Sequence, residues 1–343
     1  MEKVLDFKQF DGKTVLITGG AGSLGQALTR KLLEFDVQSI RVYSRNESKQ
    51  VEMESKLKDS RVRYLIGDIR DLPRLTRAME GVDIVFHAAA LKHVPVIEYN
   101  PFEAVNTNVI GTQNVISACI EEDVEIAVAI GTDKAVSPLN AYGATKLLME
   151  KLFISANNYL DKKRHKTKFI ALRYGNVLGS SGSVVPLFIN QIKNNKKITI
   201  TDPKMTRFSI TMDDALNFIL ESTLLGKGSE VFIPKLLAYQ ISDIRDALFE
   251  TLEEVEVENI SLRPGEKIDE TLINEHEAKY AWEFGNKYVL FSSEREEDFI
   301  KQTYEGIKKF NNNFKNYSSD NVELIGKEEL KKIFDKSGMF NPK

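Results

Sequence analysis

The sequence predicts an α/β fold in which a doubly wound, mostly parallel sheet is joined to a smaller α/β domain. Short apolar runs typical of buried strands alternate with helical segments through the first half of the chain. A glycine-rich loop, from Gly19 to Gly25, separates the first apolar run from the first helical segment. The chain has 343 residues, which is too long for one small domain. These three observations favour one large unit or two closely joined units.

The composition argues against several classes of protein. The net charge is -3 and the isoelectric point is near 6.0, so nucleic-acid binding has no support. A single cysteine, Cys119, excludes an intramolecular disulfide and fits the reducing cytoplasm. We find no leader peptide, no apolar run of about 18 residues and no histidine spacing typical of metal sites. We therefore expect a cytoplasmic protein without a membrane span or a bound metal.

The first apolar run, residues 14–18, leads directly into a loop with the spacing Gly19-x-x-Gly22-x-x-Gly25. Glycine lets the backbone approach a pyrophosphate, and the N-terminus of the following helix offers free N–H groups and a positive dipole end. Strand, glycine loop and helix in this order form the context of a dinucleotide-binding fingerprint. The loop residues predicted to contact the dinucleotide are Gly19, Ala21, Gly22, Ser23, Leu24 and Gly25.

The end of the second predicted strand indicates which dinucleotide is bound. Residues 39–43 are followed by Ser44 and Arg45, where NAD enzymes usually carry an acid for the ribose 2′-hydroxyl. A guanidinium suits a 2′-phosphate, which an acid would repel. We therefore predict NADP, with Ser44, Arg45 and Lys49 near that phosphate. The alternative is that Arg45 only stacks on the adenine.

Two further strands are predicted at residues 64–68 and 83–87. Asp68, which ends the first of them, is predicted to contact the edge of the adenine, with Ile69 beside it. Small residues follow the second strand, and Ala89 among them lets the cofactor pass closely. Lys92 is then expected near the nicotinamide or the substrate, because ligands bind at the carboxyl ends of such strands.

The loop after the buried strand at residues 126–130 carries Thr132, Asp133 and Lys134. In open α/β sheets, ligands bind at the carboxyl ends of the strands. These three proton-active side chains are therefore expected where a substrate would lie.

Tyr142 and Lys146 lie four residues apart on the helix predicted after this loop, so they share one face. A nearby cation favours the phenolate and lowers the pKa of a tyrosine. Such a phenolate can take a proton from a sugar hydroxyl while a hydride leaves for a nicotinamide. The alternative is a surface tyrosine and lysine, the commoner origin of this spacing when it occurs alone. The glycine loop and the adjoining Thr-Asp-Lys favour the chemical interpretation.

The regular alternation of predicted strands and helices ends in the second half of the chain. A buried strand within residues 169–177 is followed by a glycine-rich loop, a short strand at 198–202 and a helix from Asp213. Residues 230–233 are predicted as a last strand that returns to the main sheet. The predicted division is a dinucleotide domain over 1–178 with a return near 208–236, a mainly substrate-binding domain over 179–290, and a C-terminal tail over 291–343 with a helix near 328–334.

The glycine spacing and the Tyr142–Lys146 pair resemble the extended short-chain dehydrogenase/reductase superfamily, which has a Rossmann-type fold. More narrowly, most of the chain resembles the inverting UDP-N-acetylglucosamine 4,6-dehydratases that open the pseudaminic-acid pathway. The string AAALKH at residues 88–93 and the Thr-Asp-Lys are specific to this group and its close relatives. The alternatives are a sugar-nucleotide 4-epimerase or reductase on the same scaffold, or a non-catalytic module that retains NADP.

The resemblance implies oxidation of the sugar at C4, elimination of water across C5 and C6, and return of hydride to C6. The product would be UDP-2-acetamido-2,6-dideoxy-β-L-arabino-hex-4-ulose, with C5 inverted. By analogy Lys134 is the base and Asp133 is the acid, where dTDP-glucose dehydratases have Asp-Glu. These roles require pKa values displaced toward neutrality. The alternative, a salt pair in the loop, would favour the charged forms instead.

The resemblance also implies a homo-oligomer and further binding residues. The residues implied for the UDP-sugar are Lys92, Asn176, Gly182, Ser183, Val184, Val185, Pro186, Leu187, Thr201, Arg207, Arg263 and Glu266. Asn46 and Val177 join the residues implied for the cofactor. The chain departs from the family in having Gly131 for a serine, Asn46 for an acid and Ser181 for an arginine. The first two would loosen cofactor contacts, and the third would alter phosphate binding or sugar preference.

Overall fold

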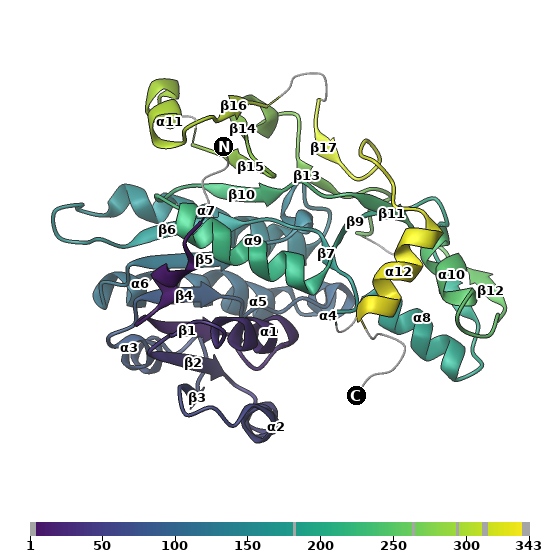
Figure 1. The fold of residues 1–343 in the computed structure, drawn as a ribbon, viewed down its shortest axis with the longest axis horizontal. Helices are drawn as coiled ribbons and strands as arrows, with labels where there is room; N and C mark the ends of the chain where they lie inside the picture. Colours follow the sequence, from purple (N-terminus) through teal and green to yellow (C-terminus); the bar gives the residue numbers. More distant parts are fainter. Residues whose placement is uncertain (1–4, 181–182, 263–264, 293–294, 311–314, 338–343) are drawn as a thin grey trace.

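The computed structural model describes residues 5–180, 183–262, 265–292, 295–310 and 315–337. Its centre is a ten-stranded sheet (Figure 1) with the order β16-β14-β15-β10-β6-β5-β4-β1-β2-β3. The strands are β1 (Thr14–Thr18), β2 (Ser39–Ser44), β3 (Val62–Ile66), β4 (Ile84–His87), β5 (Ile126–Ile130), β6 (Lys168–Leu172), β10 (Val231–Pro234), β14 (Ala281–Phe284), β15 (Lys287–Leu290) and β16 (Lys308–Lys309). From β3 to β10 neighbouring strands are parallel, which confirms the predicted doubly wound sheet.

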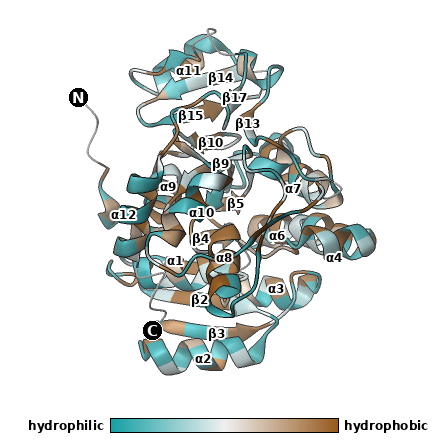
Figure 2. Cartoon of the chain, turned by 90° about the vertical axis from the view of Figure 1, so that its right-hand side faces the viewer, coloured by the Kyte–Doolittle hydropathy of each residue, from teal (hydrophilic) through white to brown (hydrophobic). Residues whose placement is uncertain are grey.

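Helices cover both faces of this sheet, and strands buried on both faces read as continuous apolar runs. Along β1, Val15 and Ile17 face one core and Leu16 faces the other, because successive side chains alternate. The first core includes residues of α1 (Ser23–Leu32) and α9 (Met212–Leu225). The second includes residues of α3 (Leu72–Met79), α6 (Gly111–Glu121) and α7 (Ala141–Tyr159). Figure 2 shows that α2 (Glu47–Leu57), beside β3, is mainly hydrophilic.

The start of α7 is fixed against the loop that precedes it. Asn140 caps the helix, because its Oδ1 accepts a hydrogen bond from the N–H of Gly143 at 2.8 Å. A Cβ at Gly143 would lie 2.2 Å from the carbonyl oxygen of Lys134, so no larger residue fits there. The helix that carries Tyr142 is therefore held directly against the Thr-Asp-Lys loop.

The smaller region consists of short sheets and three helices. β9 (Thr206–Ile210) lies between β7 (Asn176–Val177) and β11 (Ala238–Gln240), and β8 (Ile198–Ile200) pairs with β12 (Val257–Asn259). Residues of α8 (Val184–Lys193), α10 (Ile241–Phe249) and α12 (Lys327–Ser337) enclose a separate apolar core. Leu330 and Phe334 of α12 are fully buried in it, so the C-terminal segment packs on this region. The helix expected near residues 328–334 is thus confirmed.

The C-terminal part adds strands to the main sheet that we did not predict. β10 confirms the returning strand, because it pairs in parallel with β6. It is not the last strand, since β15, β14 and β16 continue the sheet antiparallel to one another. In addition, β13 (Thr271–Ile273) pairs with β17 (Tyr317–Ser318). The division of the chain at residues 178 and 290 stays a prediction.

Short helical segments make the remaining connections. They are η1 (Phe7–Phe10), α4 (Val94–Tyr99), α5 (Pro101–Ala104), η2 (Val105–Ile110), η3 (Asp133–Ala135), η4 (Glu277–Tyr280) and α11 (Glu297–Thr303). The π-helical turn η2 runs directly into α6. At their junction a Cβ on Gly111 would lie 2.7 Å from the side chain of Ile69, so the close approach needs glycine.

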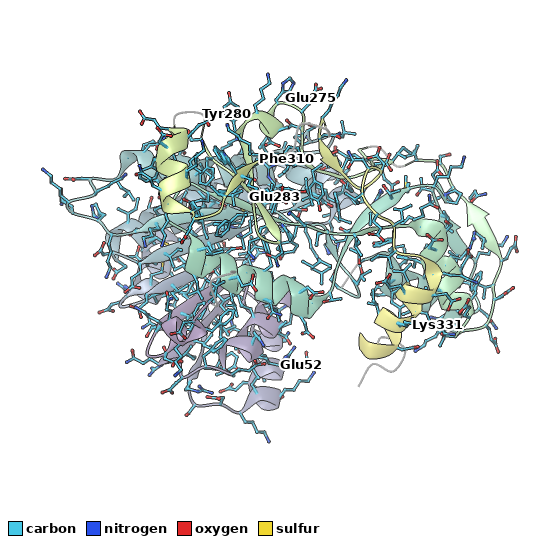
Figure 3. All side chains as sticks on the ribbon, turned by 45° about the horizontal axis from the view of Figure 1, so that its top comes forward. Glu52, Glu275, Tyr280, Glu283, Phe310 and Lys331 are labelled. Carbon is cyan, nitrogen blue, oxygen red and sulfur yellow. The ribbon has the colours of Figure 1, made fainter. Side chains whose placement is uncertain are left out.

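The outer surface and the interior differ as expected. Figure 3 shows Glu52 and Lys331 on the outside of α2 and α12, whereas Phe310 is 5% exposed. Cys119 is a fully buried free cysteine. Within the described ranges, no helix combines the length and the apolar character that a membrane span requires.

Candidate active site

A cavity of about 700 Å³ runs along the carboxyl ends of the parallel strands. The residues predicted to bind the cofactor all line it: Gly19, Ala21, Gly22, Ser23, Leu24, Gly25, Ser44, Arg45, Asn46, Lys49, Asp68, Ile69, Ala89, Lys92, Tyr142, Lys146 and Val177. Thr132 and Asn176 also line it, so the cavity connects the glycine loop with the Thr-Asp-Lys loop. The fold thus brings these residues together, while their contacts with a cofactor stay a prediction.

The glycine loop fits the pyrophosphate of a dinucleotide. Gly19 has a φ of +70°, and a Cβ there would lie 2.9 Å from the backbone of Ala89. A Cβ at Gly25 would lie 2.5 Å from Gly20. Because side chains are excluded at these points, the backbone itself forms the cavity wall. α1 begins at Ser23 in this wall, where its free N–H groups favour an anion.

Cationic side chains line the cavity near the ends of β2 and β3. Arg45, whose side chain is 53% exposed, lies 3.7 Å from Asp68. Asp68 also accepts hydrogen bonds from the guanidinium of Arg70 at 2.7 and 3.0 Å. The pKa of Lys92 is lowered by burial and then by the neighbouring charge of Lys49. This wall therefore offers several cations to a phosphate group.

Two polar residues of this wall are held by the protein itself. The Oδ1 of Asn46 accepts a hydrogen bond from the Lys49 N–H at 2.9 Å and caps α2. The Oγ of Ser44 accepts one from the Nε2 of Gln50 at 2.9 Å. These bonds fix the turn between β2 and α2 from which Arg45 extends.

Lys146 is buried on the face of α7 that it shares with Tyr142. Its Nζ donates to the carbonyl oxygen of Ile130 at 2.6 Å and lies 2.9 Å from the Sδ of Met149. Burial disfavours the ammonium and lowers the pKa of Lys146 to about 7, although Glu150 opposes the shift. Lys146 is therefore close to its titration point at neutral pH.

The pKa of Tyr142 is raised, so the expected lowering was wrong for this structure. Burial is the largest cause and raises the pKa, while the charge of Lys134 and a hydrogen bond with Thr132 lower it. The physical reason is that desolvation of the phenolate outweighs the attraction of the nearby cation. The hydrogen bond with Thr132 and the charge interaction with Lys134 nevertheless place Tyr142 in one cluster with the Thr-Asp-Lys loop.

The turn η3 places the side chains of the Thr-Asp-Lys loop. The Oγ1 of Thr132 accepts a hydrogen bond from the Lys134 N–H at 3.4 Å and donates to the Oδ1 of Asp133 at 2.9 Å. Asp133 is fully buried, and the Nζ of Lys134 lies 3.1 Å from its Oδ1 and 3.3 Å from the Oδ1 of Asn176. The second carboxylate oxygen of Asp133 has no hydrogen-bond partner among the described residues. The pair thus retains one unused acceptor.

Glu270, which we did not predict from the sequence, completes this cluster. Its Oε1 lies 3.2 Å from the Nζ of Lys134, and the residue is 3% exposed. Burial is the largest single influence on the pKa of Lys134 and lowers it, but Asp133 and Glu270 reverse the shift and raise it. The expected displacement of the Lys134 pKa toward neutrality was therefore wrong for this structure, which favours the ammonium. The only sequence signal for Glu270 was the charged turn just before it.

Tyr239 is a second residue of the cluster that the sequence did not reveal. It is 1% exposed on β11, and it shares a side-chain hydrogen bond with Asn176. Burial raises its pKa to about 12, against the lowering effects of Arg207 and Lys134. An aromatic residue on a short apolar strand is usually part of a core, and nothing in its spacing indicated a polar neighbour.

The residues predicted for the UDP-sugar are only partly gathered at the cavity. Among the described ones, Lys92 and Asn176 line it, whereas Ser183, Val184, Val185, Pro186, Leu187, Thr201, Arg207 and Glu266 do not. Gly182 and Arg263 lie outside the described residues, as does the departure at Ser181. The roles of this set stay predictions.

Arg207 was predicted to bind a phosphate of the substrate, but in this structure its partners are backbone carbonyl oxygens. Its guanidinium donates to the carbonyl oxygens of Thr206 and Ile268 at 2.7 Å each and of Lys267 at 2.9 Å. It therefore braces the segment that leads to Glu270.

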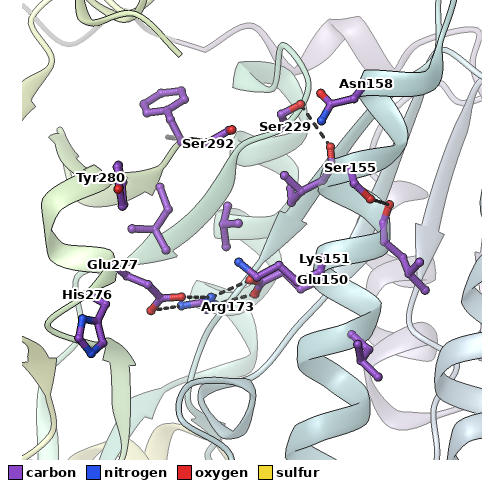
Figure 4. Close-up of a pocket in the computed structure, with 16 residues that line it drawn as sticks. Glu150, Lys151, Ser155, Asn158, Arg173, Ser229, His276, Glu277, Tyr280 and Ser292 are labelled. Atoms are coloured by element: carbon purple, nitrogen blue, oxygen red, sulfur yellow. Dashed lines mark hydrogen bonds and ion pairs between the residues drawn. The ribbon is translucent and has the colours of Figure 1, made fainter. Parts of the chain in front are cut away.

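A second cavity, of about 530 Å³, lies between α7, β6 and η4 (Figure 4). Arg173 is fully buried beside it and forms paired contacts with Glu150 at 2.6 Å and with Glu277 at 2.6 and 2.9 Å. These bonds tie β6 to α7 and η4. Its lining includes none of the residues predicted for cofactor or substrate, so we place the chemistry at the larger cavity.

Similar sequences extend over nearly the whole chain. A protein of Methanocaldococcus jannaschii named as an uncharacterized membrane protein is 45% identical, covering 94% of this chain and 96% of that one. A protein of Campylobacter jejuni named UDP-N-acetylglucosamine 4,6-dehydratase (inverting) is 44% identical, covering 95% and 98%. A protein of Rickettsia bellii named UDP-glucose 4-epimerase is 41% identical, covering 94% and 96%.

The fold agrees with that of a solved relative. The X-ray structure of Pen from Bacillus thuringiensis matches with a TM-score of 0.89 and 41% identity, covering 96% of this chain and 99% of that chain. A family model described as polysaccharide biosynthesis protein matches residues 15–292. With its motifs, its fold and its relatives in agreement, the chain belongs to the polysaccharide biosynthesis protein family.

Proposed function

We propose that this chain is a UDP-N-acetylglucosamine 4,6-dehydratase that inverts C5 and works with bound NADP. The observation that carries the proposal is that the Asp133–Lys134 pair and Tyr142 lie close enough to interact electrostatically, beside the cavity of the glycine loop. The 44% identity with an inverting dehydratase over 95% of the chain supports the same chemistry. The product would be the 4-keto-6-deoxy L-arabino sugar nucleotide named above.

NADP fits the larger cavity through its phosphates. The glycine loop would hold the pyrophosphate, Arg45 and Lys49 the 2′-phosphate, and Lys146 the nicotinamide ribose. A bound nicotinamide would accept a hydride from C4 of the sugar and return it to C6. Asp68 lies beside Arg45 and would contact the adenine.

Arg45→Ala should weaken NADP binding by about tenfold to a hundredfold, because a charged hydrogen bond contributes about 1.5 to 3 kcal/mol. NAD binding should change little, since NAD lacks the 2′-phosphate. Titration calorimetry with both dinucleotides measures the difference. Arg70→Ala is the matched control, because Arg70 also pairs with Asp68 but does not line the cavity. Equal losses of NAD and NADP affinity in Arg45→Ala would contradict the choice of NADP.

Tyr142 would take the proton of the C4 hydroxyl during oxidation. Its phenolate must form against the cost of burial. The charge of Lys134 and a hydrogen bond with Thr132 oppose that cost by lowering the pKa. Thr132 would therefore act on the tyrosine as well as on Asp133, to which it donates a hydrogen bond at 2.9 Å.

The Asp133–Lys134 pair would carry out the elimination. A 4-ketone acidifies the hydrogen on C5, so Lys134 as a free amine could accept that proton. Asp133 as a carboxylic acid could protonate the departing C6 hydroxyl, which leaves as water. In the structure the Nζ of Lys134 lies 3.1 Å from the Oδ1 of Asp133, and the raised pKa of Lys134 favours the ammonium. Transfer of one proton from Nζ to Oδ1 breaks one N–H bond, forms one O–H bond and produces both reactive forms together.

The sugar and nucleotide would lie on the side of the cavity formed by Lys92 and Asn176. The other residues proposed for the UDP-sugar are Gly182, Ser183, Val184, Val185, Pro186, Leu187, Thr201, Arg207, Arg263 and Glu266. We further propose that the enzyme is a cytoplasmic homo-oligomer and acts in pseudaminic-acid synthesis. Each subunit would consist of three chain segments, divided near residues 178 and 290.

Proton NMR with UDP-N-acetylglucosamine in heavy water, without added cofactor, tests this function. The expected result is a new C6 methyl signal, deuterium at C5 and the couplings of the L-arabino 4-keto sugar. Retention of the D-xylo configuration at C5 would contradict inversion alone. No reaction in the presence of added NADP would contradict the dehydratase assignment.

A 4-epimerase is the second candidate, favoured by the 41% identity with a protein named UDP-glucose 4-epimerase. Epimerisation needs only the Tyr142 and Lys146 apparatus, and it gives no function to the buried Asp133–Lys134 pair. A changed C4 configuration without a methyl signal in the same spectra would establish this candidate.

A further inference from the structure

Glu270 is held in place from two sides although it follows a surface turn. Its N–H donates to the Oγ of Ser319 at 2.9 Å, and its carbonyl oxygen accepts from the Ser319 N–H at 2.8 Å. Arg207, which braces the preceding residues, has its Nε 3.9 Å from the carboxylate. The carboxylate therefore reaches Lys134 from a rigid backbone that the C-terminal segment helps to form.

The two oxygens of Glu270 have different surroundings. Oε1 lies 3.2 Å from the Nζ of Lys134. Oε2 is buried and has no hydrogen-bond partner within the described residues. A buried carboxylate with one oxygen unsatisfied is costly to keep. The ion pair with Lys134 is thus the main interaction of the Glu270 side chain, and this points to a role at Lys134.

Resting on the proposed function, we propose that Glu270 is a positioning residue that holds the Lys134 ammonium beside Asp133 and keeps it protonated until the substrate is bound. Lys134 then receives a fixed place and a fixed starting charge. The proton that Asp133 needs as an acid is stored on the lysine, 3.1 Å from the Oδ1 that receives it.

Every element packed against Lys134 contributes to its charge state. Asp133 from η3 and Glu270 favour the ammonium, and Tyr142 from α7 has the same effect to a smaller extent. Arg207 from β9 opposes it, as does burial. Lys267 and Tyr239 also lie close enough to interact with the Lys134 charge. Without the Glu270 charge, one carboxylate would remain to balance burial and the surrounding cations. Glu270→Gln should therefore lower the pKa of Lys134.

The first test is a titration of Lys134 in the holoenzyme. Trace acetylation with acetic anhydride at a series of pH values, read out by peptide mass spectrometry, measures it. Only the free amine reacts, so the pH dependence of labelling gives the pKa without any turnover. In Glu270→Gln the midpoint should move to lower pH by at least one unit, a tenfold change in the ratio of amine to ammonium. Glu270→Asp keeps the negative charge but places it farther from Lys134, because the side chain is shorter. The labelling midpoint of this variant should therefore lie between those of the wild type and Glu270→Gln.

Asp269→Asn is the matched control, since it removes one charge from the neighbouring residue, whose carboxylate accepts from Thr206 at 2.7 Å. It should leave the Lys134 midpoint unchanged. An unchanged midpoint in Glu270→Gln would overturn the proposal. Should that variant not fold, an unchanged midpoint in Glu270→Asp would overturn it instead.

The pH dependence of product formation supplies a second readout. The alkaline limb of the methyl-forming reaction, where Lys134 loses the stored proton, should move to lower pH in Glu270→Gln, while reduction of the bound cofactor by substrate keeps its wild-type profile. A role in folding alone would lower both activities without moving either limb, and that result contradicts the proposal. The acetylation midpoint is measured without dehydration, so it tests the role of Glu270 even if the protein is not a dehydratase. Failure of the Glu270 proposal and failure of the proposed function can therefore be distinguished.

Discussion

Lys134→Ala is expected to reduce dehydration by about 10² to 10⁴-fold, the usual contribution of a positioned general base. Oxidation of the sugar at C4 should continue, because it depends on Tyr142 and the cofactor. Mixing enzyme and UDP-N-acetylglucosamine should therefore produce reduced nicotinamide that persists, with no C6 methyl signal. Absorbance and NMR in heavy water measure the two steps separately.

Lys134→Arg distinguishes a base from a fixed positive charge. Arginine stays protonated in proteins, so this variant keeps the ion pair with Asp133 but cannot accept the C5 proton. It should fail in dehydration as Lys134→Ala does. Dehydration near the wild-type rate in Lys134→Arg would show that Lys134 acts as an ammonium. Its role would then be that of a fixed positive charge and not that of the base.

Arg173→Met is expected to lower the free energy of unfolding by about 3 to 5 kcal/mol, the cost of breaking a buried ion pair by removing one partner. Glu150 is 1% exposed in its side chain and would lose its bonds to the Nε and Nη2 of Arg173. Glu277 is more exposed and would be affected less. Urea unfolding, at the same cofactor occupancy for both proteins, measures the change.

Lys197→Met provides the control for this change. It breaks the pair of Lys197 with Glu256, whose side chains are 51% and 69% exposed. Exposed pairs contribute about 0 to 1 kcal/mol, so its stability should stay near that of the wild type. Equal effects of Arg173→Met and Lys197→Met would mean that the buried network beside the second cavity does not stabilise the fold.

Local patterns were sufficient where the physical cause is local. The strands β1, β4 and β5 are buried along their whole length, so their apolar runs were visible in the sequence. The glycine loop could be recognised because Gly19 and Gly25 lie where side chains do not fit. The antiparallel strands β14 to β16 were missed, since they are short and two of them are partly exposed.

The sequence by itself determined the parallel part of the sheet, the wall of the larger cavity and the place of Asp133, Lys134 and Tyr142 beside it. Only the tertiary structure decided the directions in which the pKa values of Lys134 and Tyr142 are shifted. Glu270 comes 136 residues after Lys134 in the chain, yet its carboxylate lies 3.2 Å from the lysine and helps to raise its pKa. Burial in the same fold raises the pKa of Tyr142. A pKa depends on the charges and the solvent within a few ångströms, and those neighbours come together only when distant segments pack.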